Sequence, residues 1–106
     1  MAVKQQFQSF STLLAEAQTP VLVDFYATWC GPCQMMAGIL SNVSNELKGR
    51  LKIVKIDTDK YPHIASQYQV AALPTLVLFK AGQPIDRIEG VLPADQLVAR
   101  LRGQLS

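Results

Sequence analysis

The sequence predicts an α/β fold in which helices flank both faces of a central mixed β-sheet. The first observation is that short runs of β-branched, aliphatic and aromatic residues alternate with stretches whose apolar residues recur at helical spacing. Strands joined by helices indicate right-handed crossovers and a parallel pair of strands. The second observation is that two strand-like runs near the end are separated by a hairpin-length loop, which adds antiparallel strands at one side. The expected order is therefore helix, strand, helix, strand, helix, hairpin and helix.

In the first half of the chain, the pattern predicts a helix, a strand and a second helix. Ser9 or Ser11 is the expected N-cap of the first helix. The apolar residues of that helix are Phe10, Leu13, Leu14 and Ala17. After Pro20, the run Val21–Ala27 predicts a buried central strand that is interrupted by one acid. The second helix has its apolar residues at Met36, Ile39, Leu40, Val43 and Leu47. Val3–Gln5 is a further candidate for an edge strand.

In the second half, Leu51–Asp57 predicts a strand in which aliphatic residues are mixed with lysines. Asp59 is the expected cap of a short helix that reaches about Tyr68. Two further strands follow, joined by the hairpin-length connection Lys80–Gln83. They are Thr75–Phe79 and Ile85–Glu89. The last helix has its apolar residues at Leu97, Val98, Leu101 and Leu105, and Pro93 suits its first turn.

Length and composition exclude several classes of protein. A chain of 106 residues is long enough for one domain with a single core. With 49% hydrophobic and 17% charged residues, disorder and a coiled coil are not expected. A net charge of +2 without a basic cluster argues against nucleic-acid binding. No apolar stretch approaches the roughly eighteen residues of a membrane span, and Met1–Phe10 lacks the apolar region of a secretory signal. We expect a soluble, cytoplasmic monomer.

The two cysteines, Cys30 and Cys33, predict redox chemistry. A disulfide that closes so short a loop stabilises a fold by only roughly 2 kcal/mol, against roughly 3 for a fifteen-residue loop. The pair lies between the first strand and the following helix, where the chemistry of open α/β sheets gathers. Cys30 is at the helix N-terminus, which favours the thiolate that attacks disulfides. Cys33, one turn further on, is expected to be more sheltered and to resolve the mixed disulfide.

The alternative interpretation of the cysteine pair is half of a zinc site. A structural zinc ion needs four ligands, and His63 is the only other candidate ligand of the usual kind. A CxxC pair near a βαβ pattern is more typical of a redox site, so no metal is expected.

The five residues Trp29, Cys30, Gly31, Pro32 and Cys33 are consecutive. Val23-Asp24-Phe25 precedes them, and Leu73-Pro74-Thr75 and Gly90 follow them. In order and spacing these segments resemble the thioredoxin family, from about Phe10 to the end of the chain. The resemblance implies a thioredoxin fold formed by one domain over residues 1–106. Further residues resemble the y-type thioredoxins of plastids and cyanobacteria, namely Asp24–Thr28, Gln34 and Lys55–Pro62. They imply the bacterial cytoplasm, that of a cyanobacterium included, or the plastid stroma.

The resemblance also implies roles for the residues around the cysteines. Cys30 would be the nucleophile and Cys33 the resolving thiol, with Gly31 and Pro32 in the active-site loop between them. Asp24 would be a buried proton acceptor for Cys33, and burial would raise its pKa toward neutrality. An acid facing solvent at the strand end is the alternative for Asp24. Lys55 matches the family's partner of Asp24, although a solvated strand lysine is an equally good interpretation of the sequence alone.

A shallow apolar surface for the substrate backbone is implied next to the cysteines. It would consist of Trp29, Leu73, Pro74, Gly90 and Val91. Pro74 matches the family's cis-proline. Asp59 occupies the position that accepts a hydrogen bond from the indole N–H of Trp29, although Trp29 could also be a packing residue. No cofactor is implied.

Three positions depart from the family pattern. Tyr26 stands where many thioredoxins have a second tryptophan, and Gln34 replaces a frequent lysine or arginine. Gly38 replaces a proline that bends the long helix in most members. Because glycine costs about 1 kcal/mol relative to alanine in a helix, we expect this helix to be looser or less sharply bent.

The function implied by the resemblance is that of a dithiol–disulfide oxidoreductase that reduces disulfides in target proteins. Peroxide-removing enzymes such as peroxiredoxins would be among the targets. A thioredoxin reductase that depends on ferredoxin or NADPH would restore the dithiol. Within the same fold, an oxidase or isomerase is an alternative. A redox-independent binding subunit is an alternative from another class, and activity that survives replacement of both cysteines by serine would favour it.

Overall fold

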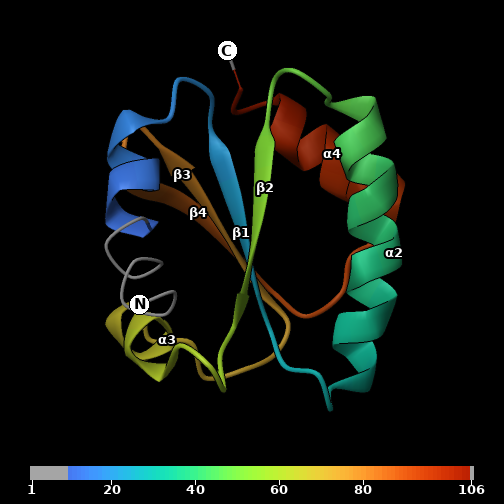
Figure 1. Cartoon of the computed structure of the whole chain (residues 1–106). Helices are drawn as coiled ribbons and strands as arrows, with labels where there is room; N and C mark the ends of the chain where they lie inside the picture. Colours follow the sequence, from blue (N-terminus) through green and yellow to red (C-terminus); the bar gives the residue numbers. More distant parts are fainter. Residues whose placement is uncertain (1–9, 106) are drawn as a thin grey trace.

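The sheet in the computed structural model, which describes residues 10–105, is mixed and lies between two layers of helices (Figure 1). The described strands are β1 (Val21–Tyr26), β2 (Lys52–Asp57), β3 (Thr75–Lys80) and β4 (Gln83–Glu89), in the order β2-β1-β3-β4. β1 pairs in parallel with β2 and antiparallel with β3, which pairs antiparallel with β4. The predicted mixed sheet is confirmed. The candidate edge strand Val3–Gln5 lies outside the described residues.

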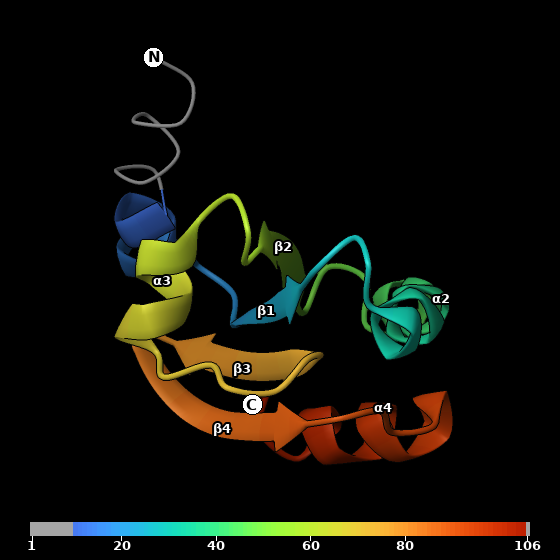
Figure 2. The same ribbon diagram turned by 90° about the horizontal axis from the view of Figure 1, so that it is seen from below.

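Helices cover both faces of the sheet (Figure 2). α2 (Gly31–Glu46) and α4 (Ala94–Arg102) lie on one face. α3 (Pro62–Gln67) lies on the other face with the helical residues 10–16. Among the described residues, no helix is both long and apolar enough to cross a bilayer.

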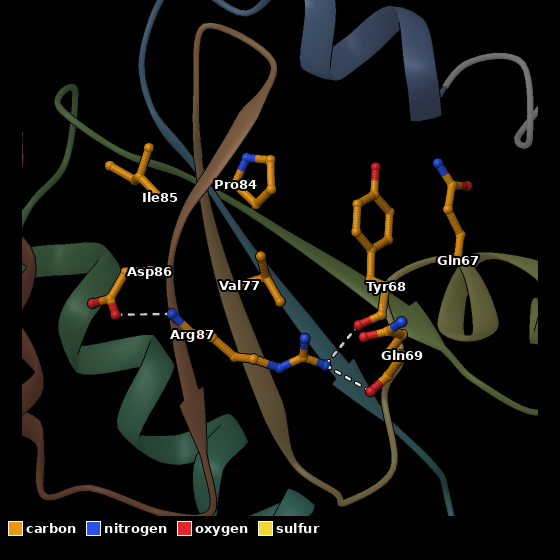
Figure 3. Close-up of a pocket in the computed structure, with 8 residues that line it drawn as sticks. All are labelled: Gln67, Tyr68, Gln69, Val77, Pro84, Ile85, Asp86 and Arg87. Carbon is orange, nitrogen blue, oxygen red and sulfur yellow. Dashed lines mark hydrogen bonds between the residues drawn. The ribbon is translucent and has the colours of Figure 1, made fainter.

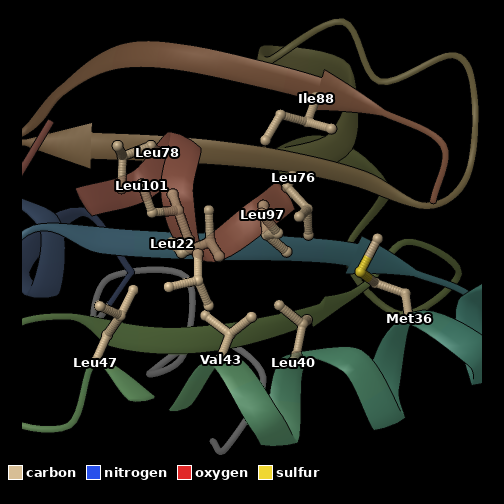
Figure 4. Close-up of a cluster of buried hydrophobic side chains, with 11 residues drawn as sticks. Leu22, Met36, Leu40, Val43, Leu47, Leu76, Leu78, Ile88, Leu97 and Leu101 are labelled. Atoms are coloured by element: carbon tan, nitrogen blue, oxygen red, sulfur yellow. The ribbon is translucent and has the colours of Figure 1, made fainter. Parts of the chain in front are cut away.

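The core is divided by the sheet into two clusters of buried side chains. The cluster between the sheet and α2 and α4 contains Leu22, Met36, Leu40, Val43, Leu47, Leu76, Leu78, Ile88, Leu97, Val98 and Leu101 (Figure 4). The cluster on the other face contains Phe10, Leu14, Val21, Val23, Phe25, Ile56, Ile64, Val77 and Phe79. Successive side chains of a strand point to opposite faces. Asp24 therefore shares the face of Leu22, which is the face covered by α2.

Three local predictions about helix starts and the hairpin are wrong. Asp59 does not cap α3, which begins at Pro62 with Tyr61 at its N-cap and no side-chain cap. Pro93 is the N-cap of α4 rather than a residue of its first turn. The hairpin loop is shorter than expected, because β3 and β4 leave only two residues, 81 and 82, between them. Both have a positive φ, of 53° and 80°, which matches the twist of two-residue hairpins.

The outer strand β4 carries an irregularity and a network of charges. Leu78 pairs with Asp86 and Phe79 with Pro84, which leaves Ile85 as an extra residue in a bulge. Asp86 is held by Arg100 of α4 through Nε and Nη2, at 2.9 and 2.8 Å, and by the amide of Gln104 at 2.8 Å. The hydrogen bonds from Arg100 are the main cause of a pKa of Asp86 lowered to about 2. This network ties the last helix to the edge of the sheet.

α2 is continuous through Gly38, and a Cβ added there would have nothing within 4 Å. Leu105 lies beyond the end of α4 but packs against the cluster under α2 and α4.

Candidate functional site

The two cysteines lie where β1 leads into α2, and they are joined by a disulfide with a Cα–Cα distance of 5.2 Å. Cys30 is the N-cap of α2, and its Sγ accepts a hydrogen bond from the backbone N–H of Cys33 at 3.2 Å. Gly31 and Pro32 begin the helix, where the missing N–H of a proline costs nothing. The helix N-terminus therefore offers N–H groups and the positive end of its dipole to a thiolate at Cys30.

Both cysteines are almost fully buried in the disulfide form. The exposed fraction is 5% for Cys30 and 4% for Cys33. The greater shelter expected for Cys33 is therefore not present in this oxidised state. They form a small cluster with Ala27, against which Tyr26 and Leu73 pack.

Asp24 is completely buried in β1, and within residues 10–105 neither of its carboxylate oxygens has a hydrogen-bond partner. Desolvation raises its pKa from 3.8 to about 6, and the positive charge of Lys55 opposes this with a smaller lowering. The alternative of a solvent-facing acid is wrong. A carboxyl group with this pKa exchanges a proton readily near neutral pH.

Lys55 lies beside Asp24 on β2 but reaches toward solvent. The two residues are partners in the parallel register of β1 and β2, and the side chain of Lys55 is exposed. Its ammonium lies 5.2 Å from the centroid of the Tyr26 ring. Both interpretations of Lys55 thus hold in part, because the lysine is solvated and its charge also acts on Asp24.

Trp29, which precedes Cys30 in the sequence, is exposed at the surface, with 72% of the residue accessible to solvent. Its indole Nε1 donates a hydrogen bond of 2.8 Å to Oδ2 of Asp59. The backbone N–H of Asp59 in turn donates to Oδ1 of Asp57 at 2.9 Å. Trp29 is therefore not a packing residue of the core, and a chain of hydrogen bonds from the end of β2 holds its indole.

The loop before β3 contacts the cysteine cluster through Leu73. The Leu73–Pro74 peptide bond is cis. Gly90, with a φ of 88°, donates its backbone N–H to the carbonyl of Pro74 at 2.9 Å. Val91 packs against the core cluster under α2 and α4 and is half-buried. The structure thus brings Leu73, Pro74 and Gly90 together, whereas the side chain of Val91 is partly taken up by the core.

The contact of Tyr26 with Lys55 and with the cysteine cluster was missed by the sequence reasoning. The two-residue spacing from Asp24 indicates that Tyr26 lies on the same face of β1, but the contact with Lys55 depends on the register between β1 and β2. Met36, one of the apolar residues expected in the second helix, is fully buried, whereas the neighbouring Met35 is 63% exposed.

A metal centre has no support in the described part of the chain. Within residues 10–105, no group of three or more His, Cys, Asp or Glu side chains is arranged to hold a metal ion. Both cysteine sulfurs are engaged in the disulfide, and His63 is exposed.

A separate groove of about 650 Å³ lies between the end of α3 and β4 (Figure 3). Its lining residues are Gln67, Tyr68, Gln69, Val77, Pro84, Ile85, Asp86 and Arg87. In it, Nη2 of Arg87 donates to the carbonyls of Tyr68 and Gln69 at 2.7 and 2.9 Å. None of the site residues predicted from the sequence lines this groove, and Arg87 has the structural role of tying β4 to the end of α3.

Comparisons with known proteins agree with the geometry. The family model described as Thioredoxin matches residues 1–103. The thioredoxin-like protein slr0233 of Synechocystis is 63% identical over 96% of this chain and 97% of its own length. Thioredoxin Y1, chloroplastic, of Arabidopsis thaliana is 57% identical over 98% of this chain, which spans only 60% of that relative. The crystal structure of chloroplastic thioredoxin z superimposes with a TM-score of 0.82 at 41% identity, over 92% of this chain and 88% of that one.

Proposed function

The chain belongs to the thioredoxin family of disulfide oxidoreductases, and from this we propose that it reduces disulfides in target proteins. The observation that carries the proposal has two parts: the Cys30–Cys33 disulfide lies at the start of α2, and the carboxylate of Asp24 is buried on the face of β1 that α2 covers. The first supplies the exchanging sulfurs, and the second supplies a group that takes up a proton.

The proposed reaction begins with the dithiol form. The Cys30 thiolate attacks one sulfur of a target disulfide, forms a mixed disulfide and releases the other target sulfur as a thiolate. Cys33 gives its proton to the Asp24 carboxylate, directly or through water, and its thiolate attacks the Cys30 sulfur. This step breaks the mixed disulfide, releases the second target thiolate and forms the Cys30–Cys33 disulfide. The target gains two electrons, which this protein loses, and its thiolates take protons from solvent.

The remaining residues of the site have supporting roles in this proposal. Lys55 contributes a positive charge beside Asp24, and Asp59 holds the indole of Trp29. Trp29 and the segment Leu73–Pro74 flank the cysteines, and with Gly90 and Val91 they would receive the backbone of the target around its disulfide.

The relatives support the partners and the compartment that we propose. Disulfide-bearing target proteins and a thioredoxin reductase are general to the family. We propose peroxiredoxins as targets, a reductase dependent on ferredoxin or NADPH, and a single-domain monomer over residues 1–106. Because relatives of this chain are cyanobacterial or chloroplastic proteins, we place it in the cytoplasm of a cyanobacterium or in the plastid stroma.

A redox titration coupled to reduction of a disulfide-bonded protein such as insulin tests the function. We expect the dithiol form to reduce the substrate at catalytic concentrations, and the double variant Cys30→Ser/Cys33→Ser to be inactive. A potential as oxidising as that of a disulfide-forming enzyme would indicate an oxidase instead. An unaffected biological activity of the double serine variant would indicate a redox-independent binding subunit.

A further inference from the structure

We propose that Tyr26 is a positioning residue whose ring holds the Lys55 ammonium on the side of β1 where Asp24 is buried. The inference rests on the proposed function, because it concerns the charge next to the group that takes the Cys33 proton. Tyr26 itself makes no contact with the proton in this proposal, and it acts through Lys55.

The three side chains share one face of two neighbouring strands. Asp24 and Tyr26 are two positions apart on β1, so their side chains point to the same face. Lys55 is the register partner of Asp24 on β2 and points to that face as well. The distance of 5.2 Å between the Lys55 ammonium and the centroid of the Tyr26 ring lies within the range of a cation–π contact.

Tyr26 is well suited to hold the lysine because it is itself held. Its carbonyl accepts hydrogen bonds from the backbone N–H and from Oγ1 of Thr58, at 2.9 and 3.2 Å. Its half-buried side chain packs against the cluster of Ala27, Cys30 and Cys33. Lys55, in contrast, is exposed and has a long flexible side chain. Contact with the fixed ring of Tyr26 restricts the side chain of Lys55 and disfavours conformations that carry its ammonium away into solvent.

Among the described residues, Lys55 is the only charged group that shifts the pKa of Asp24. α2 contains no basic residue from Gly31 to Glu46, and β3 places Leu76 opposite Asp24. The other acid on this face of β2 is Asp57, which is the buried register partner of Tyr26. Lys55 is therefore the cation next to Asp24, and its average position affects how readily Asp24 ionises. Its charge already lowers the pKa of Asp24 against the larger effect of desolvation.

The test is an NMR titration of the Asp24 carboxyl carbon in the full-length oxidised protein. We expect Tyr26→Leu to raise the pKa of Asp24, so that its ratio of protonated to ionised form rises roughly twofold to fivefold, the range of an exposed cation–π contact. Tyr26→Phe and Tyr26→Trp keep an aromatic ring and should keep the wild-type titration. In the Lys55→Gln background, Tyr26→Leu should change the Asp24 pKa no further.

An unchanged Asp24 pKa in Tyr26→Leu, or an equal change with and without Lys55, would overturn the proposal. A second measurement needs no variant, because a lysine over an aromatic ring has its ε-methylene protons shifted upfield. The absence of this shift for Lys55 in the wild-type protein would also overturn it. Both readouts are independent of disulfide reduction. Failure of the wild-type protein to reduce insulin would therefore refute the proposed function separately.

Discussion

Replacing Asp24 by asparagine should stabilise the protein by an amount that depends on pH. The carboxyl group has a pKa of about 6 in the folded protein and 3.8 as its reference value. Because the folded state holds this proton more tightly than the unfolded state, ionised Asp24 opposes folding. This pKa difference lowers the free energy of unfolding by about 3 kcal/mol at pH values above 6. The effect vanishes below pH 4. The asparagine does not titrate, so the variant escapes this loss.

The assay is urea unfolding of the oxidised wild-type and Asp24→Asn proteins, followed by circular dichroism at several pH values between 4 and 8. The free energy of unfolding of the variant, relative to wild type, should rise between pH 4 and pH 6 and then level off. A buried amide without partners carries a desolvation cost of its own, but this cost is the same at every pH and does not alter the slope.

The activity of the same variant provides the second readout. Without a carboxylate to take the proton of Cys33, reduction of target disulfides should be slower near neutral pH. A stability difference that is flat across this pH range would refute the assignment of a raised pKa to a buried Asp24. Unchanged activity would refute its role as the proton acceptor.

Three further results are expected. Cys33→Ser should capture target proteins as dithiothreitol-sensitive disulfides at Cys30, as gel electrophoresis and peptide mapping would show, whereas preferential capture by Cys30→Ser would reverse the two roles. Reduction of the disulfide should increase the fluorescence emission of Trp29, the only tryptophan of the chain. An emission that does not respond to dithiothreitol would show that the indole is too far from the sulfurs to be quenched. Asp86→Asn should destabilise the protein by about 1–2 kcal/mol at neutral pH, because the folded-state pKa of about 2 lies below the reference value of 3.8. This loss of stability should shrink as the pH falls from 4 toward 2. Asparagine thus destabilises the protein at position 86, whereas it stabilises the protein at position 24. Urea unfolding that shows no loss of stability at neutral pH would contradict the prediction.

The fold and the centre of the site were predictable because their signals are local. The alternation of strand-like and helix-like apolar segments predicts a sheet between layers of helices. Leu22 and Asp24 are two positions apart on one strand, so the acid lies on the face that α2 covers. The contact between Tyr26 and Lys55 was not predictable in this way. It depends on the register of β2 against β1, which no local pattern specifies, and a shift by one residue would turn Lys55 to the opposite face.

The local errors have equally physical causes. Asp59 is a good helix cap by type, but Pro62 determines where α3 begins, since proline is favoured in the first turn. Asp59 is thereby left to accept the hydrogen bond of Trp29. The hairpin loop was expected to span Lys80–Gln83, but Lys80 and Gln83 pair with each other and leave Ala81, an unusual residue for a positive φ, in the turn. The tight turn is set by pairing of the strands on either side rather than by its own residues.

The irregular outer strand also affects whether copies of this protein can associate through the edges of their sheets. β4 is the last strand of the described sheet on its side. Pro84 lacks an N–H, Ile85 is bulged, and the charged residues Asp86, Arg87 and Glu89 follow. Proline, bulges and charges on an outer strand all disfavour the addition of another strand. An outer strand of this kind keeps one copy of the protein from extending the sheet of another copy at high protein concentration.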